Sequence, residues 1–305
     1  MTGEFAAIET IRALLGEPAA ADEVWLGDDA AVVAVPAGQR MLLAADTVVG
    51  GVHADLEITG LDDLGWKAVA ACLSDIAAMG GEPCWALVTV TGADHDEIRS
   101  LYAGVADASL RFECPVVGGD LTAGPGLVVT VAVVGSCDGA PVLRSGARPG
   151  DEVWVTGPLG ASSAGLRHLR SNGRAATGGA AAGLVRSHAR PRPRLAEGRA
   201  ARAAGATAMI DVSDGLAADV GHLSRESGVG ISLDEVPVAE GATADEALAG
   251  GEDFELVFCV PPGDSVGRAF RGLDSPIRIG TCTGDHPGVR LAGAELRPSG
   301  WEHRI

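Results

Sequence analysis

The sequence predicts a protein of the α+β or α/β class, built from two domains in which mixed sheets are covered by helices. Helical and strand-like patterns alternate along the chain and do not separate into an all-helix part and an all-strand part. The chain has 305 residues, of which 47% are hydrophobic, and this is enough apolar material for two cores. Residues 141–151 (PVLRSGARPGD) are rich in turn formers and arginine. We therefore predict domains at 1–140 and 141–305.

The first half contains helical patterns and several strand-like runs. Residues 5–15 carry apolar side chains at helical spacing and stop at Gly16. Residues 62–79 open with two aspartates and are followed by two glycines, which are signals of a helix start and a helix end. Short apolar runs bounded by turn residues predict strands, and the Pro36-Ala37-Gly38 turn joins two of them into a hairpin. The predicted strands cover 32–35, 41–45, 84–91, 114–117 and 126–136, and a further helix covers 94–112.

The second half begins with a strand at 152–156, which leads into Gly157–Ser163 and a helix that opens there. Residues 171–183 (SNGRAATGGAAAG) have low complexity and are expected to form a mobile loop or a weak helix. Residues 208–211 form a strand, and a helix follows from Ser213 to about Ser227. Further strands are predicted at 231–233 and 254–260.

Composition excludes several classes of function. The formal net charge is −18, whereas nucleic acids and anionic membranes attract basic surfaces, so neither is expected as a partner. The six cysteines are widely spaced, which argues against a zinc site or a redox dithiol and favours reduced core residues. The start of the chain has no signal-peptide pattern, and no apolar stretch reaches the roughly 18 residues of a membrane helix. We expect a cytoplasmic protein.

Carboxylates occur beside glycines or small residues in six short stretches, each close to an apolar run. Ionised carboxylates that gather at one site repel each other unless a cation holds them. The cation that suits oxygen-only ligands and that accompanies phosphates is Mg²⁺. The pattern therefore predicts an enzyme that uses Mg²⁺ and a nucleotide. The six stretches are Gly27-Asp28-Asp29-Ala30, Ala45-Asp46-Thr47, Leu73-Ser74-Asp75, Gly118-Gly119-Asp120, Ile210 to Gly215 (IDVSDG) and Gly250 to Asp253 (GGED).

Familiar nucleotide-binding motifs are absent. A P-loop requires Gly-Lys-Ser or Gly-Lys-Thr, but the only lysine, Lys67, follows a tryptophan. No G-x-G-x-x-G leads from a strand into a helix, and the protein-kinase catalytic loop is missing. Bound ATP would have to be held by another scaffold.

Three of the acidic stretches each allow a structural and a functional interpretation. Asp75 lies within an apolar helix, where a carboxylate is costly unless it is paired or bound to a metal. The Gly118-Gly119-Asp120 stretch is either a glycine turn or a place where the backbone approaches a phosphate. Between Asp211 and Gly215 a strand ends and a helix starts, so Ser213 either caps the helix or leaves free amides for phosphate oxygens.

Taken in order, these motifs resemble the thiamine-monophosphate kinases, within the superfamily of aminoimidazole ribonucleotide synthetase, selenophosphate synthetase and a hydrogenase-maturation protein. The other superfamily members match less well. Selenophosphate synthetases are similar to one another in a reactive Cys or selenocysteine near the N-terminus, whereas the first cysteine here is Cys72, and the hydrogenase-maturation protein ends in a cysteine. The resemblance rests on Gly3-Glu4-Phe5, GDDA (27–30), Asp46-Thr47, His53, LSDIAAMGG (73–81), GGDLT (118–122), RSGARPGD (144–151), RPRPRL (190–195), IDVSDGL (210–216), GGEDFEL (250–256) and Gly300 to His303.

The resemblance implies a two-domain ATP-binding fold like that of aminoimidazole ribonucleotide synthetase, and it implies roles for particular residues. Several Mg²⁺ ions would be shared by Asp29, Asp46, Asp75, Asp120, Asp211 and Asp214. The sequence departs from the family at Ala44 and Ala45, where hydroxyl side chains are frequent, so ligation at Ala45 would come from its backbone or from water; Leu121 also replaces a frequent Thr. ATP would contact Tyr102, Gly119, Asp120, Arg144 and Ser213, and thiamine phosphate would contact His53, Glu252 and Trp301.

The resemblance also implies a mechanism and an oligomer. The acceptor is already a phosphate anion, so no residue is assigned as a general base, and the γ-phosphoryl group would pass directly in line. A homodimer formed through the N-terminal domain is expected. Asp211, Ser213 and Asp214 would have to meet Asp75 across the domain boundary. Two alternatives stay open: an ATP enzyme with another acceptor, such as formylglycinamidine ribonucleotide, and a Mg-nucleotide sensor that does not turn ATP over.

Overall fold

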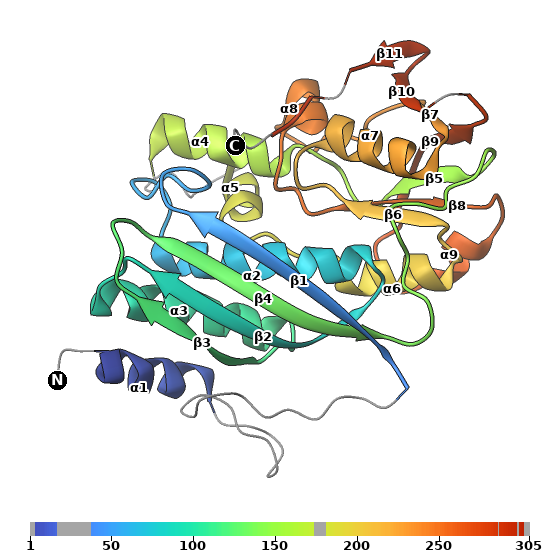
Figure 1. Cartoon of the computed structure of the whole chain (residues 1–305). Helices are drawn as coiled ribbons and strands as arrows, with labels where there is room; N and C mark the ends of the chain where they lie inside the picture. Colours follow the sequence, from blue (N-terminus) through green and yellow to red (C-terminus); the bar gives the residue numbers. More distant parts are fainter. Residues whose placement is uncertain (1–3, 17–37, 174–180, 286, 298, 302–305) are drawn as a thin grey trace. The chain divides into compact units, whose positions relative to one another are not determined.

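The computed structural model describes residues 4–16, 38–173, 181–285, 287–297 and 299–301 (Figure 1). The chain divides into two compact units. The N-terminal unit comprises Met1–Leu73 and Glu82–Gly139, and the C-terminal unit comprises Ser74–Gly81 and Ala140–Ile305. The break at Gly139 lies one residue from the boundary expected from the sequence. Residues 74–81, which were expected in the first domain, belong to the second unit because they pack with its core.

The N-terminal unit has three helices among its described residues. They are α1 (Glu4–Leu15), α2 (Leu61–Ala78) and α3 (His95–Arg111), and α2 runs on into the C-terminal unit at Ser74. Asp94 starts α3 because its side chain accepts hydrogen bonds from the N–H groups of Asp96 and Glu97, both at 2.9 Å. The side chain of Glu97 in turn accepts from the N–H of Asp94, so both partners of a capping box are present.

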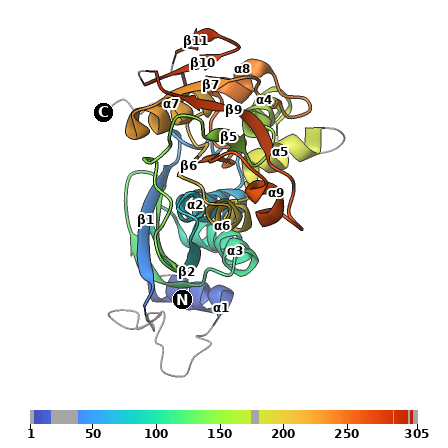
Figure 2. The same ribbon diagram turned by 90° about the vertical axis from the view of Figure 1, so that its right-hand side faces the viewer.

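The sheet of the N-terminal unit has four strands in the order β1-β4-β2-β3. The strands are β1 (Arg40–Val49), β2 (Glu82–Thr91), β3 (Val116–Thr122) and β4 (Val128–Cys137). Strands β1 and β2 each pair antiparallel with β4, and β3 pairs parallel with β2. Figure 2 shows α2 and α3 together on one side of this sheet.

The two faces of the N-terminal sheet differ in burial. Leu42, Val88 and Val131 alternate with outward-facing neighbours and are buried on the helix-covered face. On the other face, Leu43 is 78% exposed and Leu87 is 42% exposed. The sheet therefore presents large apolar side chains that nothing in this single chain covers among the described residues.

Of the expectations for the N-terminal unit, one is untested and one is wrong. The predicted strand at 32–35, and with it the hairpin, lies outside the described residues, and the strand that contains 41–45 pairs with β4. The Gly118-Gly119-Asp120 stretch is not a turn, because it lies inside β3. A Cβ atom on Gly119 would come within 1.8 Å of the Val88 carbonyl oxygen, so glycine is needed here for β3 to pair with β2.

No helix in the described part of the chain is both long and apolar enough to span a membrane.

The C-terminal unit is built on a seven-stranded mixed sheet in the order β11-β10-β7-β9-β5-β8-β6. Of the elements whose bounds follow, the sequence did not predict α5, α6, α8, α9 and β9 to β11. The strands are β5 (Glu152–Val155), β6 (Ala208–Asp211), β7 (Gly230–Leu233), β8 (Leu256–Val260), β9 (Ile277–Thr283), β10 (Gly288–Leu291) and β11 (Ala294–Leu296), and the helices are α4 (Ala161–Asn172), α5 (Ala182–Ala189), α6 (Leu195–Ala203), α7 (Leu216–Ser227), α8 (Ala244–Ala249) and α9 (Ser265–Ala269).

Hydrophobic cores lie on both faces of this sheet. Strand β8 shows why, since its five residues LVFCV are all buried. Val257 and Cys259 belong to the core that also contains Leu216 and Leu223 of α7. Phe258 belongs to the other core, together with residues of α6, of α9 and of the last turn of α2. The all-apolar run is therefore explained by a strand that is covered on both sides.

Candidate active site

Strand β6 ends in a buried carboxylate, Asp211, which is 3% exposed. The hydroxyl group of Ser74, in the last part of α2, donates a hydrogen bond to Asp211 Oδ2 at 2.7 Å. Burial raises the pKa of Asp211, and the Ser74 hydrogen bond and the positive charge of Arg144 oppose that shift. Asp75, the neighbour of Ser74, therefore belongs to the same unit as Asp211, whereas the sequence placed it in the first domain.

The turn after β6 is held by a second buried carboxylate, Asp219, which is 2% exposed. The N–H groups of Asp214 and Gly215 donate to Asp219 Oδ2 at 3.1 and 3.0 Å. Burial, together with the negative charges of Asp211 and Asp214, raises the pKa of Asp219 to about 8. Three acidic groups therefore lie within electrostatic reach of one another at the start of α7.

This turn excludes one of the two interpretations of Ser213, namely that its side chain caps the helix. Helix α7 begins at Leu216, its N-cap position is Gly215, and no side chain at that position caps it. Asp219, which was not among the residues predicted from the sequence, binds the turn amides in place of a cap. Its signal was available, because it is a carboxylate inside an apolar helix, as Asp75 is.

The GGED stretch forms a loop between α8 and β8 whose backbone is tied to the β6–α7 turn. Glu252 and Phe254 have positive φ angles of 64° and 51°, which side chains other than glycine seldom adopt. Their N–H groups donate to the carbonyl oxygens of Ser213 and Val212 at 2.8 and 2.9 Å. Such an unfavourable backbone conformation persists only where the surrounding structure holds it in place. Strained residues of this kind are concentrated at functional sites.

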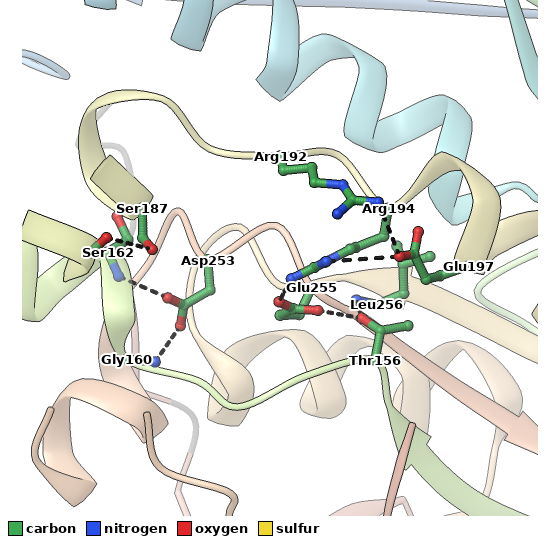
Figure 3. Close-up of polar contacts among 11 residues, drawn as sticks. Thr156, Gly160, Ser162, Ser187, Arg192, Arg194, Glu197, Asp253, Glu255 and Leu256 are labelled. Carbon is green, nitrogen blue, oxygen red and sulfur yellow. Dashed lines mark hydrogen bonds and ion pairs between the residues drawn. The ribbon is translucent and has the colours of Figure 1, made fainter. Parts of the chain in front are cut away.

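Asp253 of the same loop caps a helix that lies elsewhere in the sequence. Its carboxylate accepts hydrogen bonds from the N–H groups of Gly160 and Ser162 at 2.6 and 3.0 Å, at the start of α4 (Figure 3). Burial raises the pKa of Asp253 to about 6 even though these hydrogen bonds favour the charged form. The amides that the Gly157–Ser163 stretch offers at this helix start are thus occupied by a residue of the GGED loop.

Glu255, two residues further on, takes part in a buried charge network. It is 4% exposed, accepts a hydrogen bond from the Thr156 hydroxyl at 2.5 Å and forms an ion pair with Arg194 (Figure 3). Arg194 also lies 3.7 Å from Glu197 Oε1. The network joins the RPRPRL and GGEDFEL motifs, which are 61 residues apart, and so fixes the GGED loop on its other side.

Glu252 faces α5 from this loop. Its Oε2 atom lies 3.5 Å from Nδ1 of His188, and the Glu252 side chain is 32% exposed. The same Nδ1 atom lies 3.1 Å from the hydroxyl oxygen of Ser162. Ser162 and His188 are both buried, so a partly exposed carboxylate is backed by two buried polar side chains.

The C-terminal end of the described chain returns to the β6–α7 turn. The N–H of Trp301 donates to the carbonyl oxygen of Asp214 at 3.1 Å, and the Trp301 side chain is 50% exposed. Ser213, Asp214, Glu252 and Trp301 therefore occupy connected segments of the C-terminal unit.

In the N-terminal unit, the strand register separates two of the predicted metal ligands. Asp46 is in β1 and Asp120 is in β3, the two edge strands, which lie three strand spacings or roughly 14 Å apart. Asp46 is aligned with Val131, whose side chain is on the helix-covered face, whereas Asp120 is aligned with Thr89 on the opposite face. Within a single copy of this unit, Asp46 and Asp120 therefore lie too far apart to ligate the same ion, and the family resemblance itself implies several ions. Ala45 is exposed and lies opposite Ala132.

Tyr102 requires a second correction. Its side chain is 2% exposed, and its hydroxyl group donates to the Val88 carbonyl oxygen at 3.3 Å. Burial raises the pKa of the hydroxyl group. Since the ring is part of the core beneath the sheet, we do not retain the Tyr102 side chain as an ATP contact.

His53 lies in the turn that follows β1. Its Nδ1 atom accepts a hydrogen bond from the Val49 N–H at 2.9 Å, so that nitrogen carries no proton in this geometry. Its side chain is half-buried. Such fixed orientation fits a residue that orients a ligand better than one that removes a proton.

The acidic residues match Mg²⁺ in chemistry, since they offer oxygen donors only. The negative charge of Asp214 raises the pKa of the buried Asp211, and the charges of Asp211 and Asp214 raise the pKa of the buried Asp219, so a cation would relieve this repulsion. Within the described ranges, no three Asp, Glu, His or Cys side chains converge on a single point. Asp29, one of the six predicted ligands, lies outside the residues that the structure describes.

Comparison with known proteins identifies the family. Residues 27–137 match the N-terminal domain of AIR synthase related proteins, and residues 148–291 match the C-terminal domain. The thiamine-monophosphate kinase of Escherichia coli (strain K12) is 38% identical over 252 residues, which cover 78% of this chain and 77% of that protein. The chain belongs to the thiamine-monophosphate kinase family. The relative from Mycobacterium tuberculosis (strain CDC 1551 / Oshkosh) is 38% identical over 300 residues, covering 91% of this chain and 87% of its own.

Solved structures of thiamine-monophosphate kinases have the same fold. The enzyme from Stenotrophomonas maltophilia K279a is 33% identical with a TM-score of 0.84, covering 96% of this chain and 98% of its own. AaThiL in complex with AMPPCP and TMP is 31% identical with a TM-score of 0.80, covering 99% of this chain and 97% of its own. The hydrogenase maturation protein HypE shares the fold at 17% identity. The two-domain fold expected from the family resemblance is therefore confirmed.

Proposed function

We propose that this chain transfers the γ-phosphoryl group of ATP to thiamine monophosphate and releases thiamine diphosphate and ADP. The observation that carries the proposal is the identity of 36–38% with thiamine-monophosphate kinases over more than three quarters of the chain. The complex of a 31% identical relative with AMPPCP, an ATP analogue, and TMP supports the same pair of substrates. We place the reaction in the cytoplasm.

The proposed mechanism is a direct in-line transfer without a general base. The acceptor phosphate is already anionic at neutral pH, so the barrier lies in bringing two polyanions together and aligning them. Arg144, whose charge acts on Asp211, is the cation proposed to neutralise part of the phosphate charge. The residues proposed for nucleotide contact are Arg144, Ser213, Asp120 and the backbone of Gly119.

Mg²⁺ is the proposed metal. The residues proposed to hold it are Asp75, Asp211 and Asp214 in the C-terminal unit and Asp29, Asp46 and Asp120 in the N-terminal unit, with backbone oxygen or water at Ala45. When bound, Mg²⁺ neutralises phosphate charge and polarises the transferred group. The buried site of Asp211 supports this role, since an unpaired carboxylate there is costly.

His53, Glu252 and Trp301 are proposed to contact thiamine monophosphate. Glu252 is suited to accept a hydrogen bond from the aminopyrimidine, and the exposed ring of Trp301 is suited to stack on the cationic thiazolium. His53 is assigned to substrate orientation because its Nδ1 atom already accepts a backbone hydrogen bond.

A homodimer through the N-terminal sheet is also proposed. Its outward face carries Leu43 and Leu87, which are 78% and 42% exposed, and paired sheet faces of two copies would bury both. Sedimentation equilibrium of the wild-type protein beside Leu43→Glu tests this. A monomeric wild type, or a variant that dimerises as strongly as the wild type, would contradict the dimer.

The activity is tested by incubating the purified protein with ATP, Mg²⁺ and thiamine monophosphate and identifying the products. We expect thiamine diphosphate and ADP in equal amounts. ADP formation that does not depend on thiamine monophosphate, but does depend on formylglycinamidine ribonucleotide, would point to the other acceptor. Tight ATP binding with no turnover in either mixture would point to a nucleotide sensor.

A further inference from the structure

The GGED loop (residues 250–255) fixes the positions of its acidic side chains to different degrees. Asp253 caps α4, and Glu255 is paired with Arg194 and Thr156 (Figure 3). The Glu252 side chain is 32% exposed. The loop therefore anchors Asp253 and Glu255 through the helix cap and the ion pair, while the carboxylate of Glu252 remains partly exposed beside α5.

His188 lies directly behind that carboxylate. Its side chain is 6% exposed, and its Nδ1 atom lies 3.5 Å from Glu252 Oε2 and 3.1 Å from the Ser162 hydroxyl oxygen. A Cβ atom on Gly165 of α4 would come within 2.1 Å of the Leu184 carbonyl oxygen of α5. The missing side chain at Gly165 therefore lets α5 approach α4 closely enough to place His188 against Ser162 and Glu252.

The chemistry of the three groups favours one tautomer of His188. A carboxylate oxygen near an unprotonated nitrogen would face its lone pair, so the Nδ1–H form is favoured next to Glu252. In this tautomer the N–H donates toward Glu252 Oε2 and toward the Ser162 hydroxyl oxygen, and both oxygens accept. At 3.5 Å the contact is long for a hydrogen bond, and polar contacts of this kind commonly shorten when substrate binds.

We propose that His188 is a positioning residue for thiamine-monophosphate recognition, acting by holding Oε2 of Glu252 so that Oε1 meets the amino group of the pyrimidine. The inference rests on the proposed function, and in particular on Glu252 as a substrate contact. His188 itself does not touch the substrate, and Ser162 supports the ring from the side of α4.

The test is steady-state kinetics of His188→Ala with each substrate varied in turn. We expect the KM for thiamine monophosphate to rise about tenfold, which is the loss of roughly one charge-assisted hydrogen bond. The KM for ATP and kcat should stay within about twofold, because an interaction made equally in ground state and transition state affects KM alone. His188→Asn should restore most of the affinity, since its amide nitrogen can occupy the place of Nδ1.

A double-mutant cycle with Glu252→Gln separates positioning from packing. If His188 acts through Glu252, the double variant should bind thiamine monophosphate no more weakly than Glu252→Gln alone. His168→Ala on α4 is the matched control, because it removes an imidazole from the adjacent helix, and its KM values should match those of the wild type. Should His188→Ala fold poorly, Ser162→Ala removes the support of the ring and should raise the same KM about threefold.

Three outcomes would overturn the inference: an unchanged KM for thiamine monophosphate in His188→Ala, an equal rise in both KM values with a lowered melting temperature, or additive effects in the cycle. A wild-type protein that neither binds nor phosphorylates thiamine monophosphate would instead overturn the proposed function, and this inference with it. The wild-type assay is done first, so the two failures are distinguished.

Discussion

The buried pair of Arg194 and Glu255 gives a sharp prediction about stability. Replacing Arg194 with Met keeps the length of the side chain but removes its charge, and this leaves Glu255 and Glu197, which are 4% and 3% exposed, without that partner. Removing one partner of a buried pair costs about 3–5 kcal/mol, because the remaining charge is uncompensated. Because the Arg194 side chain is 20% exposed, we expect the free energy of unfolding to fall by an amount near the lower limit, about 3 kcal/mol.

The assay is thermal and urea unfolding, followed by circular dichroism. A loss of about 3 kcal/mol corresponds to a fall of roughly 6–12 °C in melting temperature for a unit of this size. Arg278→Met is the matched control, since Arg278 pairs with Asp234 at 3.1 Å and with Glu152 at 3.4 Å but is 40% exposed. Its loss should stay below about 1 kcal/mol.

Equal shifts for the two variants would refute the reasoning, because exposed and buried ion pairs would then contribute alike. The double variant Arg194→Met/Glu255→Gln provides a further check. It should recover part of the lost stability, since it removes the carboxylate left uncompensated at Glu255. A double variant that is less stable than Arg194→Met would also contradict the account.

Three further predictions concern the site. Asp75→Asn should abolish phosphoryl transfer and leave the melting temperature unchanged, because a neutral amide binds bridging Mg²⁺ poorly, and near-normal turnover would contradict the metal role. Trp301→Ala should weaken thiamine-monophosphate binding by about 0.5–2 kcal/mol and leave ATP affinity unchanged, as measured by calorimetry; a lower melting temperature with unchanged affinity would indicate packing alone. Because burial raises the pKa of Asp253 from 3.8 to about 6, its contribution to stability is present below about pH 4 and is lost as the pH rises through 6. Urea unfolding at pH 5 and pH 8 should therefore show the wild type losing stability relative to Asp253→Asn, and a pH-independent difference would contradict the shift.

The sequence was most informative where local chemistry decides the structure. The helix predicted at 94–112 is confirmed as α3. Its start is encoded locally, because Asp94 and Glu97, three positions apart, form a capping box. The helix predicted at 62–79 is confirmed as α2 for a similar reason, since acidic residues open it and glycines follow it. The resemblance to a known family extended this information to the whole fold.

Features that depend on distant contacts were not predictable from local patterns. Helices α5 and α6 lie among arginines, prolines and low-complexity sequence, and they are stabilised by packing on α4 and on β8. The separation of Asp46 from Asp120 follows from strand order, because β4 and β2 lie between their strands. The contact of Asp253 with α4 joins residues 91 positions apart. Such pairings are set by the assembled sheet and leave no periodic signal in the sequence.

The last turn of α2 has a consequence for how the protein is made. Ala77 and Ala78 belong to a core that also contains Val142, Met209 and Phe258, so this core cannot close until a segment made early meets segments made much later. During synthesis, the growing chain must keep residues 74–81 available while more than half of the protein is still to emerge. For the same reason, a protease cut between Gly139 and Ala140 would not release two independent pieces. Each fragment would hold part of one core, and the nicked protein should stay together as a complementing pair.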